Sequence, residues 1–272
     1  MANSHDESPP AAEVLTPLRP LTTALDWDDL VLDDAARKEL DDIVAWARHE
    51  STLMNDWGLG RHIKPGLRCF FYGPAGTGKT LAAALIGKAL GRPIHRVSLH
   101  VILSSPGGDT GSTLDRLFNT AMANGWILLF DEADALSGRR AEPRDANDRF
   151  ANQQIAYLLQ RLEDFAGLIV VISNLDSALD EAFARRFQSA VHFPMPAPAE
   201  RLRLWQDLMK DKPTLPDFDL RKLAAEHELT GGAIVEAVRY ACLQAVAREP
   251  RAIGHADIKE GMKRGRQQTV MA

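Results

Sequence analysis

The sequence predicts an α/β fold in two parts, a parallel-sheet domain followed by a small α-helical domain. Short runs that are apolar throughout, such as residues 126–130 and 168–172, alternate with stretches of helical periodicity. Strands without polar positions are typical of a parallel sheet that helices cover on both faces. No strand pattern follows the proline-rich residues 194–198, so the rest of the chain is expected to be helical.

The individual elements follow from apolar spacing and from the residues that begin and end helices. An early helix is expected to begin at Asp33 or Asp34, because apolar residues recur at helical spacing from Leu40. Strands are expected at residues 67–72, 94–99, 126–130, 168–172 and 191–193. Further helices are expected at residues 79–90, 113–123, 150–165, 199–210, 220–228, 232–248 and 255–264.

The same patterns predict the domain boundaries. Residues 1–25 contain four prolines and little periodic hydrophobicity, which indicates a flexible N-terminal tail. The α/β domain is expected at residues 26–194 and the helical domain at residues 199–266. Residues 267–272 are expected to be a C-terminal tail.

Composition argues against several classes of protein. The 272 residues are 45% hydrophobic and 25% charged, as is usual for a globular chain, and the net charge of −5 argues against a protein that coats nucleic acid. No apolar run approaches the roughly 20 residues of a membrane-spanning helix, and the N-terminus lacks a signal-peptide pattern. Cys69 and Cys242 lie in apolar segments and are expected to be free thiols in a reducing cytoplasm. The eight histidines lack ligand spacing, so no structural metal is expected.

The strongest motif lies between the strand expected at residues 67–72 and the helix after it. Residues 73–80 read Gly-Pro-Ala-Gly-Thr-Gly-Lys-Thr and fit the pattern G-x-x-x-x-G-K-[ST]. The glycines let main-chain N–H groups close around phosphate oxygens, and the helix N-terminus adds the positive end of its dipole. Lys79 can then reach the outer phosphates, and the Thr80 hydroxyl can hold Mg²⁺. The sequence therefore predicts a site for a nucleoside triphosphate.

Two acidic residues follow a later strand. Asp131 and Glu132 come directly after the apolar residues 127–130, and Asp131 is 52 residues beyond Lys79. Asp131 is expected to hold Mg²⁺ through water. Glu132 is expected to polarise the water that attacks the terminal phosphate.

Polar residues near the next strand extend the predicted site. Asn174 stands two residues after the strand expected at residues 168–172 and is expected to lie beside the outer phosphate, where it can orient water. Arg185 and Arg186 follow eleven and twelve residues later. A phosphate site with one lysine gains most from an arginine supplied by a neighbouring subunit.

Together these residues resemble the AAA+ ATPases, specifically the AAA group of protein unfoldases and remodelling factors, over about residues 26–264. Stretches such as residues 131–139 and 145–152 are similar to single-module bacterial AAA proteins, including those encoded with contractile injection systems. The resemblance implies a P-loop NTPase domain with a helical lid, and ATP and Mg²⁺ as cofactors. It also implies a homo-oligomeric ring of six subunits and a protein partner, which the sequence does not identify.

The resemblance assigns roles to individual residues. Those implied to contact the nucleotide are Gly73, Pro74, Ala75, Gly76, Thr77, Gly78, Lys79, Thr80, Leu81, Asp131 and Gly232, with Thr80 and Asp131 on Mg²⁺. Those implied to act in catalysis are Lys79, Glu132, Asn174, Arg185 and Arg186. Residues 27–31 match the segment near the adenine, and residues 231–234 match the start of the lid helix beside the nucleotide.

Two departures from the family pattern concern arginines. The Pro-Gly that usually separates the two trans-acting arginines is absent, so either Arg185 or Arg186 is expected to touch the phosphate. Residues 231–233 contain no arginine, which leaves Arg239 as a weak candidate for a sensor on the lid.

A third departure concerns the pore of the implied ring. Residues 105–108 read Ser-Pro-Gly-Gly where the family has an aromatic residue that grips substrate. Ile102 and Leu103 are either a substitute contact or buried packing. Two other functions therefore stay open: a nucleotide-gated assembly scaffold with low turnover, against which Glu132 argues, and an ATP-dependent loader acting on DNA, against which the acidic composition argues.

Overall fold

The computed structural model of the chain describes residues 18–99, 110–131, 146–174, 185–215 and 219–271. Its first part is built on a six-stranded sheet in the order β1-β3-β4-β5-β2-β6. The strands are β1 (Leu18–Leu21), β2 (Leu67–Tyr72), β3 (Ile94–Val97), β4 (Ile127–Phe130), β5 (Leu168–Ser173) and β6 (Ser189–His192). All neighbouring strands are parallel except β1, which is antiparallel to β3. The predicted parallel sheet is therefore confirmed.

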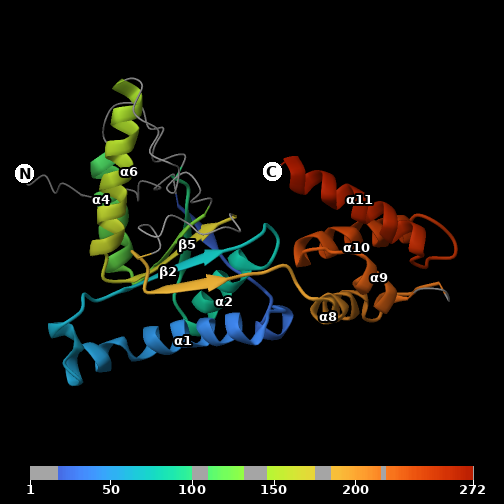
Figure 1. Cartoon of the computed structure of the whole chain (residues 1–272), viewed down its shortest axis with the longest axis horizontal. Helices are drawn as coiled ribbons and strands as arrows, with labels where there is room; N and C mark the ends of the chain where they lie inside the picture. Colours follow the sequence, from blue (N-terminus) through green and yellow to red (C-terminus); the bar gives the residue numbers. More distant parts are fainter. Residues whose placement is uncertain (1–17, 100–109, 132–145, 175–184, 216–218, 272) are drawn as a thin grey trace, which may run out of the picture.

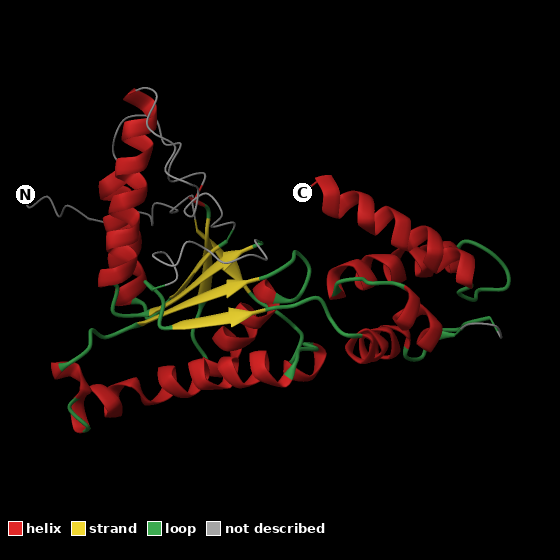
Figure 2. Ribbon diagram, viewed as in Figure 1, coloured by secondary structure: helices red, strands yellow, loops and turns green. Residues whose placement is uncertain are grey.

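Helices cover both faces of this sheet (Figure 1, Figure 2). The helices are α1 (Asp34–Ser51) and α2 (Lys79–Leu90) on one face, and α4 (Thr110–Ala123) and α6 (Ala146–Asp164) on the other. In β4, Ile127 and Leu129 join the apolar core on the α1 and α2 side. Leu128 and Phe130 join the core on the α4 and α6 side. Both faces of the strand are buried, which explains why its sequence has no polar position.

The helical part follows β6 and has a core of its own. It comprises α8 (Pro198–Met209), α9 (Leu220–Glu226), α10 (Gly231–Val246) and α11 (His255–Met271). Figure 1 shows these helices as a separate group beyond the arrowhead of β2. The fully buried Trp205 of α8 packs in a cluster with Leu223, Ile234 and Ile258 from the other three helices. Among the described helices, none combines the length and apolar character that a membrane span requires.

Both predicted tails are shorter than expected. Residues 18–21, expected within the flexible tail 1–25, form β1, because their main-chain groups pair with the open edge of β3. Pro20 is tolerated in this strand because an edge strand needs hydrogen bonds on one side only. Residues 267–271, expected as a C-terminal tail, continue helix α11. Residues 1–17 lie outside the described part of the chain.

The two cysteines are free thiols, as predicted. Cys69 lies within the buried strand β2, and burial raises the pKa of its thiol well above the ordinary value. The group is therefore protonated at neutral pH and packs as a small apolar side chain. Cys242 is half-buried on α10.

An ion pair between an exposed arginine and a buried aspartate fixes the turn between α10 and α11. Nη1 of Arg248 donates to Oδ1 of Asp257 at 2.8 Å, and the N–H of Gly254 donates to Oδ2 at 2.8 Å. The Asp257 side chain is only 8% exposed, and the Arg248 guanidinium holds the pKa of its carboxyl below the ordinary value. Because the folded-state pKa is lowered, the stabilisation is complete above the unfolded pKa of about 3.9 and is lost as pH falls through the folded value.

We expect Asp257→Asn to lower the free energy of unfolding by about 1–3 kcal/mol at pH 7, because Arg248 and Gly254 lose a charged acceptor. Urea unfolding followed by circular dichroism measures this change, and the difference from wild type should shrink below about pH 4. Glu249→Gln is the matched control, since the Glu249–Arg251 pair in the same turn is exposed and should contribute under about 0.5 kcal/mol. Equal losses for the two variants would contradict the assigned role of Asp257.

Candidate nucleotide-binding site

Three neighbouring strands end at one edge of the sheet, and a predicted site residue follows each. β2 is parallel to β5, and β5 is parallel to β4, so their carboxyl ends meet. Gly73 follows β2, Asn174 follows β5 and Asp131 follows β4. Open parallel sheets bind ligands at this edge. The fold therefore brings three separate sequence motifs to one place.

The loop at residues 73–78 has a backbone conformation that requires glycine. Gly73, Gly76 and Gly78 have φ values of 133°, 79° and 106°, a region that strains other residues. A Cβ at Gly73 would also lie 2.2 Å from the main-chain oxygen of Phe193. Gly78 supplies no capping side chain at the start of α2. The first N–H groups of that helix are therefore suited to an anion.

Lys79 is buried, at 4% exposure, although it carries a charge. Its Nζ donates to the main-chain oxygens of Gly73 and Pro74, each at 2.7 Å. The Thr77 hydroxyl donates to the oxygen of Pro74 at 2.9 Å, which closes the loop further. A buried ammonium needs such acceptors, so the loop is folded around Lys79.

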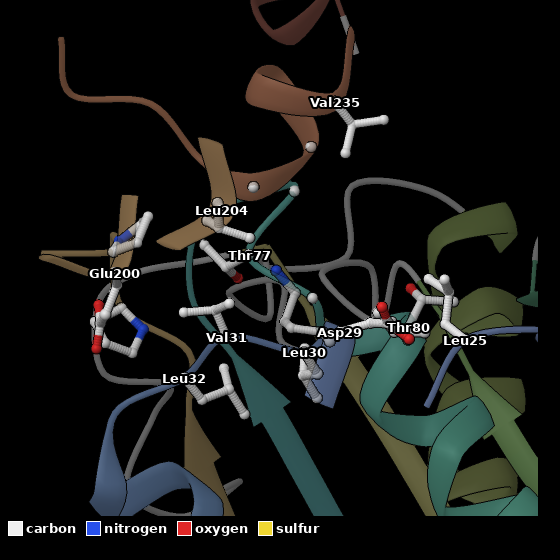
Figure 3. Close-up of a pocket in the computed structure, with 18 of the residues that line it drawn as sticks. Leu25, Asp29, Leu30, Val31, Leu32, Thr77, Thr80, Glu200, Leu204 and Val235 are labelled. Carbon is white, nitrogen blue, oxygen red and sulfur yellow. The ribbon is translucent and has the colours of Figure 1, made fainter. Parts of the chain in front are cut away.

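A cavity of about 430 Å³ opens between this loop and the helical part (Figure 3). The predicted site residues that line it are Gly76, Thr77, Gly78, Lys79, Thr80, Leu81, Asp131, Asn174 and Gly232. Gly73, Pro74 and Ala75 belong to the part of the loop that does not line the cavity. Glu132 lies outside the described residues, as do Ile102, Leu103 and residues 105–108.

Part of the cavity wall is apolar, and only one side of it was expected from the sequence. Leu30 and Val31, from the segment expected near the adenine, line one side. Leu204 of α8 and Val235 of α10 line the opposite side, above Leu30 and Val31 in Figure 3. Apolar walls of this kind suit a flat aromatic ring. Leu204 and Leu208 are four residues apart on α8, a spacing that sequence analysis cannot distinguish from ordinary core packing.

Within the described part of the chain, two hydrogen bonds join the helical part to the sheet domain beside this cavity. The N–H of Gly232 donates to the oxygen of Gly76 at 2.8 Å. Nη2 of Arg203 donates to the oxygen of Asp28 at 2.9 Å. The side chain of Thr230 caps α10 by accepting from the N–H of Ala233. The start of α10 is thus placed directly against the loop at residues 73–78. Arg239, the weak candidate for a lid sensor, is exposed, does not line the cavity and pairs with Glu236.

Asp131 is paired with a cation that sequence analysis did not identify. Nη2 of Arg96 lies 3.1 Å from Oδ2 of Asp131, whose side chain is 12% exposed. Arg96 belongs to β3 and stands opposite Leu129 in the parallel register, near the end of β4. The Thr80 hydroxyl and the Asp131 carboxylate line the same cavity, and oxygen ligands of this kind fit Mg²⁺.

The two predicted arginines lie away from the cavity of their own chain. Arg185 and Arg186 do not line it, and they precede β6, which enters the sheet beside Cys69 near the amino end of β2. The loop at residues 73–78 lies at the opposite, carboxyl end of β2. Arg186 forms an ion pair with Glu163 near the end of α6. Neither arginine therefore completes the cavity within one subunit.

Comparison with known proteins identifies the family that this part of the chain matches. The family described as "ATPase family associated with various cellular activities (AAA)" matches residues 69–195, from β2 to just after β6. The chain carries an AAA ATPase domain. The matched range includes the loop around Lys79, Asp131 and Asn174. These cavity-lining residues therefore lie within the part of the chain that matches the ATPase family.

Several curated proteins are similar to the AAA domain and its helical part. The chain is 29% identical over 246 residues to the ATP-dependent zinc metalloprotease FtsH 3 of Symbiobacterium thermophilum, covering 88% of this chain and 38% of that protein. It is 32% identical over 186 residues to the uncharacterized AAA family ATPase y4kL of Sinorhizobium fredii, covering 68% of this chain and 54% of that protein. It is 26% identical over 234 residues to the proteasome-activating nucleotidase of Methanopyrus kandleri, covering 84% of this chain and 53% of that protein. The chain thus spans about half of these relatives or less.

We expect Gly76→Ala to weaken nucleotide binding to the AAA domain by about tenfold or more, because a Cβ there would lie 2.7 Å from the Thr230 hydroxyl and force α10 away from the loop. Titration with a fluorescent ADP analogue measures the affinity. Gly125→Ala is the matched control, since Gly125 also has positive φ but a Cβ there meets no atom within 4 Å. Both variants should lose about 1 kcal/mol of stability. Unchanged affinity in Gly76→Ala would contradict the contact between α10 and the loop.

Proposed function

We propose that this protein is a Mg²⁺-dependent AAA ATPase that works as a ring of identical subunits, six by family resemblance, and uses ATP hydrolysis to remodel or disassemble a protein partner. The observation that carries the proposal is the convergence of Lys79, Thr80, Asp131 and Asn174 on one cavity beside the helical part. Two relatives support a protein partner, since one is named a metalloprotease and the other a proteasome-activating nucleotidase.

In this proposal, the loop around Lys79 binds the phosphates of ATP. The main-chain N–H groups at the start of α2 and the Lys79 ammonium offset the negative charge of the outer phosphates. The apolar wall that includes Val31 and Leu204 receives the adenine. Thr80 and Asp131 would hold Mg²⁺, which when bound supplies further positive charge to the phosphate oxygens.

Hydrolysis then depends on how the attacking water is oriented. Asn174 lines the cavity at the end of β5 and is proposed to orient that water. Glu132 follows Asp131 in sequence and is proposed to polarise it. An arginine of a second copy is proposed to complete the positive charge around the terminal phosphate.

The helical part is proposed to convert turnover into movement. The Gly232–Gly76 hydrogen bond connects it to the loop around Lys79. The Arg203–Asp28 hydrogen bond connects it to the segment at residues 27–31. Loss of the terminal phosphate would remove negative charge from the cavity, beside both the loop and the start of α10. Rotation of the helical part against the sheet would then pull on a bound protein.

We expect Glu132→Gln to bind ATP as tightly as wild type but to turn it over about 10²–10⁴ times more slowly, since the amide cannot accept a proton from water. Steady-state phosphate release and size-exclusion chromatography with ATP measure turnover and ring formation. Glu228→Gln, an exposed acid outside the cavity, is the matched control and should behave as wild type. Equal turnover by Glu132→Gln and wild type would contradict the role of Glu132. ATP-dependent ring formation without measurable turnover in wild type would favour the assembly scaffold instead.

A further inference from the structure

The segment at residues 25–29 is a short turn at the edge of the cavity. Its first and last residues, Leu25 and Asp29, line the cavity. The N–H of Asp26 donates to Oδ2 of Asp29 at 2.7 Å, and the N–H of Asp29 donates to the main-chain oxygen of Asp26 at 3.1 Å. The turn is therefore closed by its own hydrogen bonds, and its contacts with other elements decide where it lies.

Two cations of the sheet domain fasten this turn. Nζ of Lys88, on α2, donates to the main-chain oxygen of Leu25 at 3.0 Å and to Oδ1 of Asp26 at 2.7 Å. Nη1 of Arg37, on α1, donates to the oxygen of Trp27 at 3.4 Å, and its guanidinium carbon lies 4.6 Å from the centroid of the Trp27 ring. The Trp27 ring also packs against the core on the α1 and α2 side. The turn is thus a fixed part of the sheet domain.

A third cation reaches the turn from the helical part. Nη2 of Arg203, on α8, donates to the main-chain oxygen of Asp28 at 2.9 Å. The next residue of α8, Leu204, lines the cavity opposite Val31 (Figure 3). The Arg203–Asp28 hydrogen bond therefore holds together the two segments that carry the facing apolar walls.

This link acts on a different wall from the Gly232–Gly76 hydrogen bond. Gly76 belongs to the loop around Lys79, whereas Asp28 belongs to the turn that precedes Leu30 and Val31. Loss of the Arg203 side chain would release α8 from the turn and leave the hydrogen bonds of Lys79 within the loop intact. The two ends of the cavity can therefore be tested separately.

We infer that Arg203 is a positioning residue that closes α8 over the base of the bound nucleotide, and that it thereby sets how long an adenine nucleotide stays in the cavity. Lys88 and Arg37 supply the fixed point against which it closes. A ligand that consists of phosphates alone does not use the apolar walls and should not depend on Arg203. The inference rests on the proposed function, in which the adenine lies between Val31 and Leu204.

A comparison of two ligands tests the inference. Arg203→Ala should weaken the binding of a fluorescent ADP analogue about three- to tenfold, since a hydrogen bond from a charged donor is lost at a side chain that is 54% exposed. The dissociation rate of the analogue should rise by about the same factor in stopped-flow displacement. The affinity for inorganic triphosphate, measured by isothermal titration calorimetry, should stay within about twofold of wild type.

Arg221→Ala is the matched control, since Arg221 is an exposed arginine on α9 that does not line the cavity. It should bind both ligands as wild type does. Unchanged ADP affinity in Arg203→Ala would overturn the inference. Equal weakening of both ligands would also overturn it, because the effect would then lie at the loop around Lys79.

Steady-state kinetics separates positioning from a general structural effect. In Arg203→Ala the KM for ATP should rise about three- to tenfold while kcat stays within about twofold of wild type, because the groups around the terminal phosphate are unchanged. A lower kcat at unchanged KM would overturn the inference. Failure of wild type to bind the ADP analogue would instead refute the proposed function, so the two failures are distinguishable.

Discussion

The buried ammonium of Lys79 is the interaction on which the rest of the site depends. The chain must turn from β2 into α2 within a few residues, and the two main-chain oxygens 2.7 Å from Nζ of Lys79 fix how it turns. Glycine at positions 73, 76 and 78 permits the positive φ values that this path requires. The buried charge and the loop therefore stabilise each other, and together they form a concave surface suited to phosphate.

The parallel sheet gives this loop its chemical neighbours. Because β2, β5 and β4 lie side by side and point the same way, the residues after them meet at one edge. That arrangement brings Asn174 and Asp131 to the cavity, and β3 adds Arg96 beside Asp131. The start of α10 closes the cavity through the Gly232–Gly76 hydrogen bond. The cavity and the proposed moving part are thus in direct contact.

Much of the fold and of the candidate site could be predicted from the sequence. The parts that could not be predicted lack a local sequence pattern. The loop at residues 73–80 and the polar residues after apolar strands are local patterns, and they account for seven of the nine predicted residues that line the cavity. The other two, Leu81 and Gly232, were implied by the family resemblance. β1 could not be predicted, because a four-residue edge strand is defined by its pairing with β3 rather than by its own composition. The turns at Thr52–Asp56 and Leu59–Arg61 carried no pattern either. The Arg96–Asp131 and Arg186–Glu163 pairs join residues distant in sequence, so only the fold reveals them.

Equilibrium binding of a non-hydrolysable ATP analogue with Mg²⁺, measured by isothermal titration calorimetry, tests whether the loop around Lys79 holds the phosphates of a nucleotide. We expect one nucleotide per subunit with a dissociation constant between about 1 μM and 1 mM, and loss of this binding when the ammonium of Lys79 is removed. The nucleotide should also protect the amide hydrogens around Lys79 from exchange with solvent. No detectable binding at millimolar nucleotide, or binding that is unaffected by loss of Lys79, would contradict this function of the loop.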